Sequence, residues 1–359
     1  MGGPGDKNMK DIYIIHQYLD KNHFKALYEC GEEFGYRIKD YFVLDKFYLL
    51  KNVIKKEIFN KKLGLTYKEG WQYYREQKKL LTLENELVIV GLAPYDPLLK
   101  KYQKVFQKNK CVYFSSWQTW DGTDFPRGSL KYKPLWEKIL REDFSGAACV
   151  SKRTQAGVGQ YIKNTIVVNH AVPVEEYHKK VYALQNNKFL FFGRFEDAKN
   201  MDWMLRWLES SDSYECEFDF AGFGAYQSKI ERLAQKDRRV HYLGLLDKSQ
   251  LKEILCKYDF IILPSKTEPF GISLIEALAS GTPCVTSDAL GPAEIITDGY
   301  NGIVCNHTNY NSFVSAMNRV KMLSQEEYER LCNNARASGE EYSSRCIAKK
   351  WSKLLDSIE

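Results

Sequence analysis

Two glutamates, Glu268 and Glu276, lie eight positions apart in EPFGISLIEALASGTPCV, which spans residues 268–285. Pro269 disfavours a helical backbone at Glu268, and Gly271 permits a left-handed or closely approached backbone. Glu268 is therefore expected in a loop, and Glu276 in the first turn of the helix that follows. Ionised carboxylates accept hydrogen bonds but do not donate them, so this pair suits a ligand that carries hydroxyl groups.

The helix that carries Glu276 is expected to begin near Ile272 or Ser273 and to end at Gly281, after the turn that follows an apolar strand at 260–263. A helix that begins at the carboxyl end of a parallel strand offers free N–H groups and a positive dipole end, which favour phosphate. A ligand with hydroxyl groups on both sides of a diphosphate would meet one glutamate at each end. A nucleoside diphosphate sugar is such a ligand.

Each glutamate also has a structural alternative. Ser273 to Glu276 is a capping-box pattern, in which the glutamate only satisfies a backbone N–H of its own helix. Glu268 is open to the simpler interpretation of an exposed loop acid, which is common.

Cations that suit the diphosphate occur in FFGRFEDAKN, residues 191–200. A strand runs into Gly193, and Arg194 and Lys199 follow before the next helix. Arg offers a planar fork of donors and Lys a point charge, and both suit phosphate oxygens. An Arg and a Lys of this kind are usually solvated surface residues, but these two follow the first strand of the half that carries the glutamates.

The elements that would position these side chains follow an α/β pattern. Short apolar runs typical of doubly buried strands alternate with segments long enough for helices. The expected strands lie at 12–15, 87–90, 111–114, 165–168, 188–192, 217–221, 240–242, 260–263 and 283–286. This predicts two doubly wound sheets, with ligands at the carboxyl ends of the strands.

The distribution of charge, the spacing of the cysteines and the length of the apolar runs narrow the class of protein to which the chain can belong. Residues 1–180 carry 31 Lys and Arg against 21 Asp and Glu, whereas the rest carries 21 against 25, so the first half is the one expected to meet an anionic partner. The nine cysteines form no C-x-x-C pair and no cluster with histidine, which predicts reduced thiols, a cytoplasmic protein and no metal. No apolar run approaches the ~20 residues that span a bilayer.

Residues 46–79 hold ten basic residues against three glutamates, interleaved with apolar ones. Apolar and basic residues at helical spacing fit a helix that lies on an anionic membrane surface. A solvated basic helix with its apolar face on the core explains the pattern equally well.

Taken together, these stretches resemble the family-4 retaining glycosyltransferases of the GT-B fold, also called glycosyl transferases group 1. The resemblance covers nearly all of residues 188–304. Its pieces are GRFEDAK at 193–199, FAGFG at 220–224, HYLGLLDKSQL at 241–251, LPSKTEPFGISLIEALASGTPCV at 263–285 and GPAEIITDGYNGIV at 291–304.

The resemblance implies two Rossmann-like domains that face each other across a cleft and a transfer of sugar from a nucleoside diphosphate sugar, with UDP as the expected nucleotide. Arg194 and Lys199 would neutralise the departing diphosphate, Glu268 would contact the transferred sugar and Glu276 the ribose. No metal or other cofactor is then required, because the nucleotide sugar is a substrate. The remaining donor-binding residues would be Gly193, Gly222, Gly224, Leu243, Leu245, Leu246, Phe270, Gly271, Ile272 and Ser273.

The first half departs from the family pattern, which leaves the acceptor chemistry open. His16 ends the first strand and could orient an acceptor hydroxyl or a donor phosphate, or it could be a structural hydrogen-bonding residue. Trp117 and Trp120 could stack on a sugar ring or cover the core, and Asp121 could accept a proton or cap a turn.

The resulting hypothesis is a two-domain enzyme that extends a glycan or lipid-linked acceptor in the cytoplasm, with peripheral association at the cytosolic membrane face. Its acceptor domain would span residues 9–176 and its nucleotide-sugar domain residues 177–341, with a last helix within 342–359 packing back on the first domain. The rival hypothesis is a non-catalytic partner subunit of the same fold. No nucleic-acid-binding motif is recognisable.

Overall fold

The computed structural model describes residues 9–18, 22–45, 67–117, 120, 128–181, 188–213 and 215–358. Contacts divide the chain into two compact units. Unit 1 comprises residues 1–171 and 344–359, and unit 2 comprises residues 172–343. The sequence instead placed the two divisions after residues 176 and 341.

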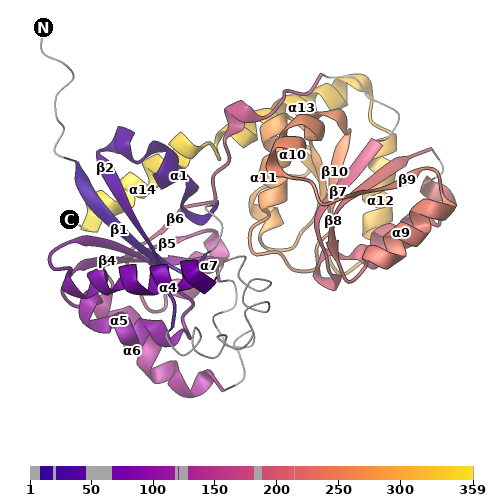
Figure 1. Ribbon diagram of the computed structural model, residues 1–359. Coiled ribbons are helices and arrows are strands. Elements are labelled where there is room, and N and C mark those ends of the chain that lie inside the picture. The colour runs from indigo at the N-terminus through magenta and orange to yellow at the C-terminus, as the bar shows by residue number, and fades with distance from the viewer. Residues whose placement is uncertain are drawn as a thin grey trace, which may run out of the picture. The chain divides into compact units, whose positions relative to one another are not determined.

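Unit 1 contains a six-stranded parallel sheet in the order β2-β1-β3-β4-β5-β6 (Figure 1). Its strands are β1 (Lys10–His16), β2 (Tyr36–Phe42), β3 (Leu87–Gly91), β4 (Lys110–Ser115), β5 (Gly146–Cys149) and β6 (Thr165–Val167). Its helices are α1 (Lys25–Cys30), α4 (Tyr67–Glu76), α5 (Pro97–Phe106), α6 (Lys133–Asp143), α7 (Lys152–Val158) and α14 (Ser344–Ile358). Because β1 pairs with both β2 and β3, the strand order reverses there, and this switch point is where α/β sheets bind ligands.

The C-terminal helix α14 belongs to unit 1, where it packs on α1, β5 and β6. Its Trp351 is 1% exposed and stacks on Phe114 at the end of β4, with ring centroids 6.0 Å apart. Phe24 completes this aromatic group at 6.2 Å from Trp351. Large buried rings dominate core energetics, so α14 is an integral part of the unit 1 core.

Unit 2 contains a second six-stranded parallel sheet, in the order β12-β11-β10-β7-β8-β9 (Figure 1). Its strands are β7 (Lys188–Phe195), β8 (Glu217–Gly224), β9 (Val240–Gly244), β10 (Phe260–Leu263), β11 (Cys284–Ser287) and β12 (Gly302–Cys305). Its helices are α8 (Met201–Leu208), α9 (Gln227–Lys236), α10 (Lys248–Ile254), α11 (Ile272–Ser280), α12 (Tyr310–Lys321) and α13 (Gln325–Glu340). The order reverses between β7 and β10, which pair directly. The prediction of an α/β chain with two doubly wound sheets is confirmed.

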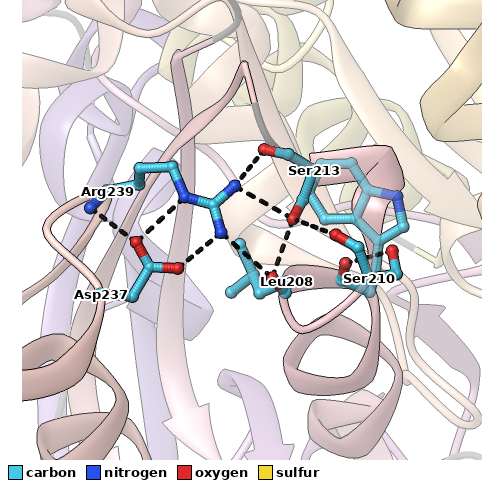
Figure 2. Close-up of polar contacts among 6 residues, drawn as sticks. Leu208, Ser210, Ser213, Asp237 and Arg239 are labelled. Atoms are coloured by element: carbon cyan, nitrogen blue, oxygen red, sulfur yellow. Dashed lines mark hydrogen bonds and ion pairs between the residues drawn. The ribbon is translucent and has the colours of Figure 1, made fainter.

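At the amino ends of β8 and β9, Arg239 joins three segments of unit 2 (Figure 2). Its guanidinium donates to the Asp237 carboxylate and to the backbone carbonyls of Ser213 and Leu208. It thereby gives a donor to the Leu208 carbonyl at the end of α8, where a helix leaves its last carbonyls without partners of its own. This edge of the sheet is held by a structural cation, opposite the edge that carries the predicted site.

Within the described ranges, no helix has both the length and the apolar character needed to cross a membrane.

Candidate active site

The predicted donor residues gather at the switch point of unit 2, where the loops after β7 and β10 meet. The first loop contains a short 3-10 helix, Asp197–Lys199, and the second runs from Pro264 to the start of α11. Backbone N–H groups of Lys266 and Thr267 donate to the carbonyl of Ala198, at 2.8 and 3.4 Å. The two loops are therefore joined by main-chain hydrogen bonds.

Lys199 and Glu268 form an ion pair across this junction. Their side chains are only 15% and 11% exposed. Two charges held this far from water are costly unless they are well paired. The structure thus brings together, in direct contact, the cation predicted for the diphosphate and the acid predicted for the sugar.

Arg194 lies apart from this pair, near the end of β7. Its guanidinium contacts Glu196 at 2.9 Å, and the two side chains are 65% and 39% exposed. Exposed ion pairs of this kind contribute little to stability. Arg194 can therefore exchange Glu196 for an incoming anion at small cost.

The three glycines predicted for this edge have different surroundings. A side chain at Gly222 would meet the carbonyl oxygen of Gly193 at 1.9 Å, and one at Gly224 would meet that of Phe195 at 2.6 Å. These two glycines therefore allow β7 and β8 to lie close together at their carboxyl ends. Gly193 has a φ of 137° and open space where a side chain would begin, as required where a ligand approaches the backbone.

The loop after β10 turns into α11 at Gly271, whose φ of 108° excludes most other residues. Gly291 lies behind this loop, since a side chain there would meet the Glu268 carbonyl oxygen at 2.4 Å. Phe270 is 2% exposed and contacts Tyr342 within unit 2, so only its backbone can face a ligand. Ile272 and Ser273 are half-buried at the start of α11, where the first N–H groups of a helix precede the reach of its own carbonyls, and the next one, of Leu274, donates to the Gly271 carbonyl at 2.9 Å.

The capping-box interpretation of Glu276 is wrong. The helix begins at Ile272 with Gly271 as its N-cap and no side-chain cap bond, so Ser273 lies inside the first turn and Glu276 in the second. Glu276 instead accepts a hydrogen bond from the hydroxyl of Tyr177, at 3.3 Å, a partner that no sequence motif indicated.

Burial raises the pKa of Glu276 to about 7, although Lys248, the Tyr177 hydroxyl and Lys252 oppose the shift. The carboxyl group therefore changes its charge near neutral pH. Buried acids with a shifted pKa are typical of functional sites.

The leucines predicted to bind the donor lie at the end of β9 or directly after it. Leu245 is 72% exposed, while Leu243 and Leu246 are half-buried. The capping box of Asp247 and Gln250 ends this segment and starts α10. An exposed leucine at the carboxyl edge of the sheet is available to a flat apolar ligand.

His16 in unit 1 has both ring nitrogens occupied. Its Nδ1 accepts from the backbone N–H of Tyr18 at 3.1 Å, so its Nε2 is the protonated nitrogen and donates to Asp40 at 2.9 Å. The side chain is buried at 4% exposure. This geometry favours the structural interpretation of His16 over a role in orienting an acceptor or a phosphate.

The two tryptophans of unit 1 differ. Trp120 is 6% exposed and donates from its indole to the carbonyl of Trp117, and a side chain at Gly157 would meet its ring at 2.2 Å. Trp120 therefore covers the core, as the second interpretation held. Trp117 is half-buried and lines a pocket of about 160 Å³ together with Tyr18 at the carboxyl ends of β1, β3 and β4.

Some predicted residues lie outside the described ranges. Asp121 is one, and residues 46–66 of the basic segment 46–79 are others. In the described part of that segment, α4 packs Trp71, Tyr73 and Tyr74 against Phe42 and Leu44 of unit 1. Among the residues that the structure describes, no group of three or more His, Cys, Asp or Glu side chains could hold a metal ion.

Comparisons with known proteins agree with this geometry. Residues 174–338 match the sequence model of the family described as glycosyl transferases group 1. A similar protein is the uncharacterized glycosyltransferase MJ1178 of Methanocaldococcus jannaschii, 28% identical over 201 residues, which are 55% of this chain and 54% of that protein. The first three curated relatives are matched over only 35% to 54% of their length.

Solved structures resemble the whole chain. Sucrose-phosphate synthase from Thermosynechococcus elongatus has a TM-score of 0.70 at 16% identity, covering 97% of this chain and 99% of that one. Anabaena Alr3699/HepE in complex with UDP and glucose has a TM-score of 0.68 at 15% identity, covering 97% and 100%. At these identities the likeness shows the fold, which is that of GT-B glycosyltransferases. Residues 174–338 of this chain therefore match the glycosyl transferases group 1 family, and the chain has the fold of GT-B glycosyltransferases.

Proposed function

We propose that the chain is a retaining, metal-independent glycosyltransferase that moves a sugar from a nucleoside diphosphate sugar to a hydroxyl group of a glycan or lipid-linked acceptor. The observation that carries the proposal is the buried Lys199–Glu268 ion pair at the switch point of a group 1 domain. Synthesis of cell-surface polysaccharide or another glycoconjugate is the process that fits this reaction.

In this proposal the donor spans the junction of the two loops. Lys199 and Arg194 bind the diphosphate, and the first turn of α11 adds backbone N–H groups and its positive dipole end. Glu268 accepts hydrogen bonds from hydroxyl groups of the transferred sugar, and Glu276 from those of the ribose. Glu268 already contacts Lys199, whereas Glu276, whose pKa is raised to about 7, must lose its proton to act only as an acceptor.

The donor nucleotide in the proposal is UDP. One fold neighbour, Anabaena Alr3699/HepE, holds UDP and glucose. In this chain the base would lie against Leu243, Leu245 and Leu246, beside the close strand contact that Gly222 and Gly224 permit.

The transfer itself needs positioning and charge more than covalent help from the protein. The bond between the anomeric carbon and the phosphate oxygen breaks, and the acceptor oxygen bonds to the same face of that carbon. The acceptor proton passes to the departing phosphate, whose developing charge Lys199 and Arg194 stabilise. Because these cations act on the leaving group, the reaction needs no metal ion.

The acceptor in this proposal binds to unit 1. The pocket beside Trp117 and Tyr18 lies at that unit's own switch point and presents aromatic rings with uncharged polar groups. Such a lining suits a sugar ring, which has apolar faces and neutral hydroxyl groups.

Membrane association through the basic segment 46–79 is a separate part of the proposal. Liposome flotation of wild type and of a variant with Lys55, Lys56, Lys61 and Lys62 changed to Glu tests it. The variant should lose binding to anionic vesicles, and unchanged flotation would remove the membrane surface from the proposal.

A screen of UDP-, GDP- and TDP-sugars for thermal stabilisation and for slow hydrolysis tests the central function. At least one nucleotide sugar should stabilise the protein and be hydrolysed, with UDP-sugars strongest. Stabilisation with neither hydrolysis nor transfer would support the non-catalytic partner instead. No response to any nucleotide sugar would contradict both.

A further inference from the structure

Asn200 directly follows Lys199 and has an unusual backbone. Its φ of 53° and ψ of 41° place it in the left-handed region, where asparagine is tolerated better than most side chains. It is also the N-cap of α8, a position where asparagine ordinarily bonds to its own helix. Here it makes no such cap bond. Its carboxamide forms a hydrogen bond outside its own helix instead.

That carboxamide crosses to the second loop of the site. Asn200 Nδ2 donates to the carbonyl oxygen of Pro264 at 2.7 Å, and the side chain is 1% exposed. Pro264 is the first residue after β10, four positions before Glu268. One buried hydrogen bond therefore joins the segment that carries Lys199 to the segment that carries Glu268.

A second side-chain tie between the same loops is exposed. Lys266 Nζ contacts the Asp197 carboxylate at 2.9 Å, with side chains 45% and 70% exposed. Water and salt screen such a pair, whereas water cannot replace a buried amide bond. Of these two ties, the Asn200 bond is the one able to fix the loops.

Asparagine also carries a cost at this position. Asn200 Oδ1 is buried and has no hydrogen-bond partner within the described part of the chain, and the same holds for the nearby Ser265 Oγ. Buried polar atoms normally find partners, and exceptions are tolerated mainly where function requires them. The bond to Pro264 gives a reason to keep a carboxamide here.

We propose that Asn200 is a positioning residue of the donor site, whose carboxamide sets the separation of Lys199 from Glu268. This inference rests on the proposed donor roles of those two residues. Without the bond, the two loops remain joined by main-chain contacts but Lys199 loses its fixed approach to the leaving group.

Two variants separate positioning from simple stability. Asn200→Gly keeps the left-handed backbone and removes the carboxamide, and Asn200→Asp keeps the shape but sets a carboxylate against the Pro264 carbonyl. In hydrolysis or transfer assays with a UDP-sugar, well below the unfolding temperature, Asn200→Gly should lower kcat by about 10- to 100-fold. Its donor KM should change by less than about threefold, because Arg194 and the first turn of α11 still bind the donor in the ground state and the misplaced Lys199 is missed mainly in the transition state.

The aspartate variant supplies a pH readout that a purely structural role would not give. Protonation restores an O–H donor toward Pro264, so the activity of Asn200→Asp relative to wild type should rise as the pH falls. Lys266→Gln, which removes only the exposed tie, is the matched control and should stay within about twofold of wild type.

A lower melting temperature with unchanged kcat in Asn200→Gly, or a flat activity ratio for Asn200→Asp across pH, would overturn the positioning role while leaving the proposed function intact. Wild-type protein that neither binds nor hydrolyses any nucleotide sugar would overturn both.

Discussion

The carboxyl edges of the two sheets differ in charge, although both have a switch point. In unit 2 the switch point holds the Lys199–Glu268 pair, and Arg194 lies near the end of β7 in contact with Glu196. In unit 1 the residues that line the pocket at the switch point are all uncharged, and His16 is satisfied internally. The charged edge suits a diphosphate and the neutral edge suits a sugar acceptor.

Net charge and the candidate diphosphate site point to different halves of the chain. The first half of the chain is the basic one, and we expected it to meet the anionic partner, yet the candidate diphosphate site lies in the half that carries more acids than bases. A few cations held by loop geometry outweigh a diffuse surplus of exposed lysines, because salt screens the latter. The comparison makes separate predictions for each unit.

The largest expected effect concerns stability and tests whether the units act separately. Trp351→Ala removes a ring buried against Phe114 and Phe24 and should lower the free energy of unfolding of unit 1 by about 3–5 kcal/mol. Denaturant unfolding followed by fluorescence measures it, with Trp207→Ala in unit 2 as the matched change. Folded Trp351→Ala should bind the donor as tightly as wild type does. A loss of donor affinity in this variant would show that the donor site of unit 2 depends on the core of unit 1.

The second effect concerns the charged edge. Lys199→Ala removes the buried cation and should lower kcat/KM by about 10²- to 10³-fold, because the developing charge on the leaving group is left unpaired. Arg239→Ala is the control, since it deletes a cation from the opposite edge of the same sheet. Equal losses in the two variants would mean that the effect reflects damage to unit 2 as a whole.

The third effect is a pH dependence of donor binding through Glu276. Its pKa is raised to about 7 in the folded protein, so it holds its proton below that pH and only the ionised form accepts two ribose hydroxyl groups. Donor affinity should fall about tenfold from pH 8 to pH 6. Calorimetric titration checks this, and Glu276→Gln should flatten the profile.

The raised pKa of Glu276 also affects stability, but with the opposite dependence on pH: donor affinity should rise with pH, whereas the free energy of unfolding should fall. Between about pH 4.5 and 7 the folded protein binds a proton that the unfolded chain has lost, so the free energy of unfolding falls as the pH rises, by roughly 3 kcal/mol in total from this group. In Glu276→Gln this contribution should disappear from the stability profile. Identical profiles for the two proteins would contradict the raised pKa.

The smallest effect concerns the neutral edge. Trp117→Ala should raise the KM for a carbohydrate acceptor by roughly 3- to 10-fold through the loss of an aromatic wall, without a change in the donor KM. Steady-state kinetics with each substrate varied in turn separate the two constants. A change confined to the donor KM would remove Trp117 from the acceptor pocket.

Much of the fold could be predicted from the sequence because buried parallel strands form continuous apolar runs. Three strands lack that signal. β2 carries three charged residues between its buried ends, β5 is the small-residue stretch GAAC, and β12, GIVC, has only two branched aliphatic residues. Such segments become strands because they pair with neighbouring strands of the sheet, and the local sequence pattern does not indicate this pairing.

The loop positions of Glu268 and Lys199 could be predicted from local signals, namely Pro269 after Glu268 and the strand that runs into Gly193 before Lys199. The site was not predictable where a side chain's partner lies far along the chain. The bonds of Tyr177 to Glu276, of Asp40 to His16 and of Asn200 to Pro264 join residues between 24 and 99 positions apart. Trp120 likewise could be assigned to the core only once Gly157 was seen to lie against its ring.

The central claim is that a nucleoside diphosphate sugar binds unit 2 with its diphosphate on Lys199 and its sugar on Glu268. Calorimetric titration of wild type, Lys199→Ala and Glu268→Gln with UDP and with a UDP-sugar tests it most directly. The account predicts that Lys199→Ala weakens both ligands, whereas Glu268→Gln weakens the UDP-sugar but binds UDP as well as or better than wild type, because Lys199 loses its competing carboxylate. Equal weakening of both ligands by Glu268→Gln, or unchanged UDP binding by Lys199→Ala, would contradict it.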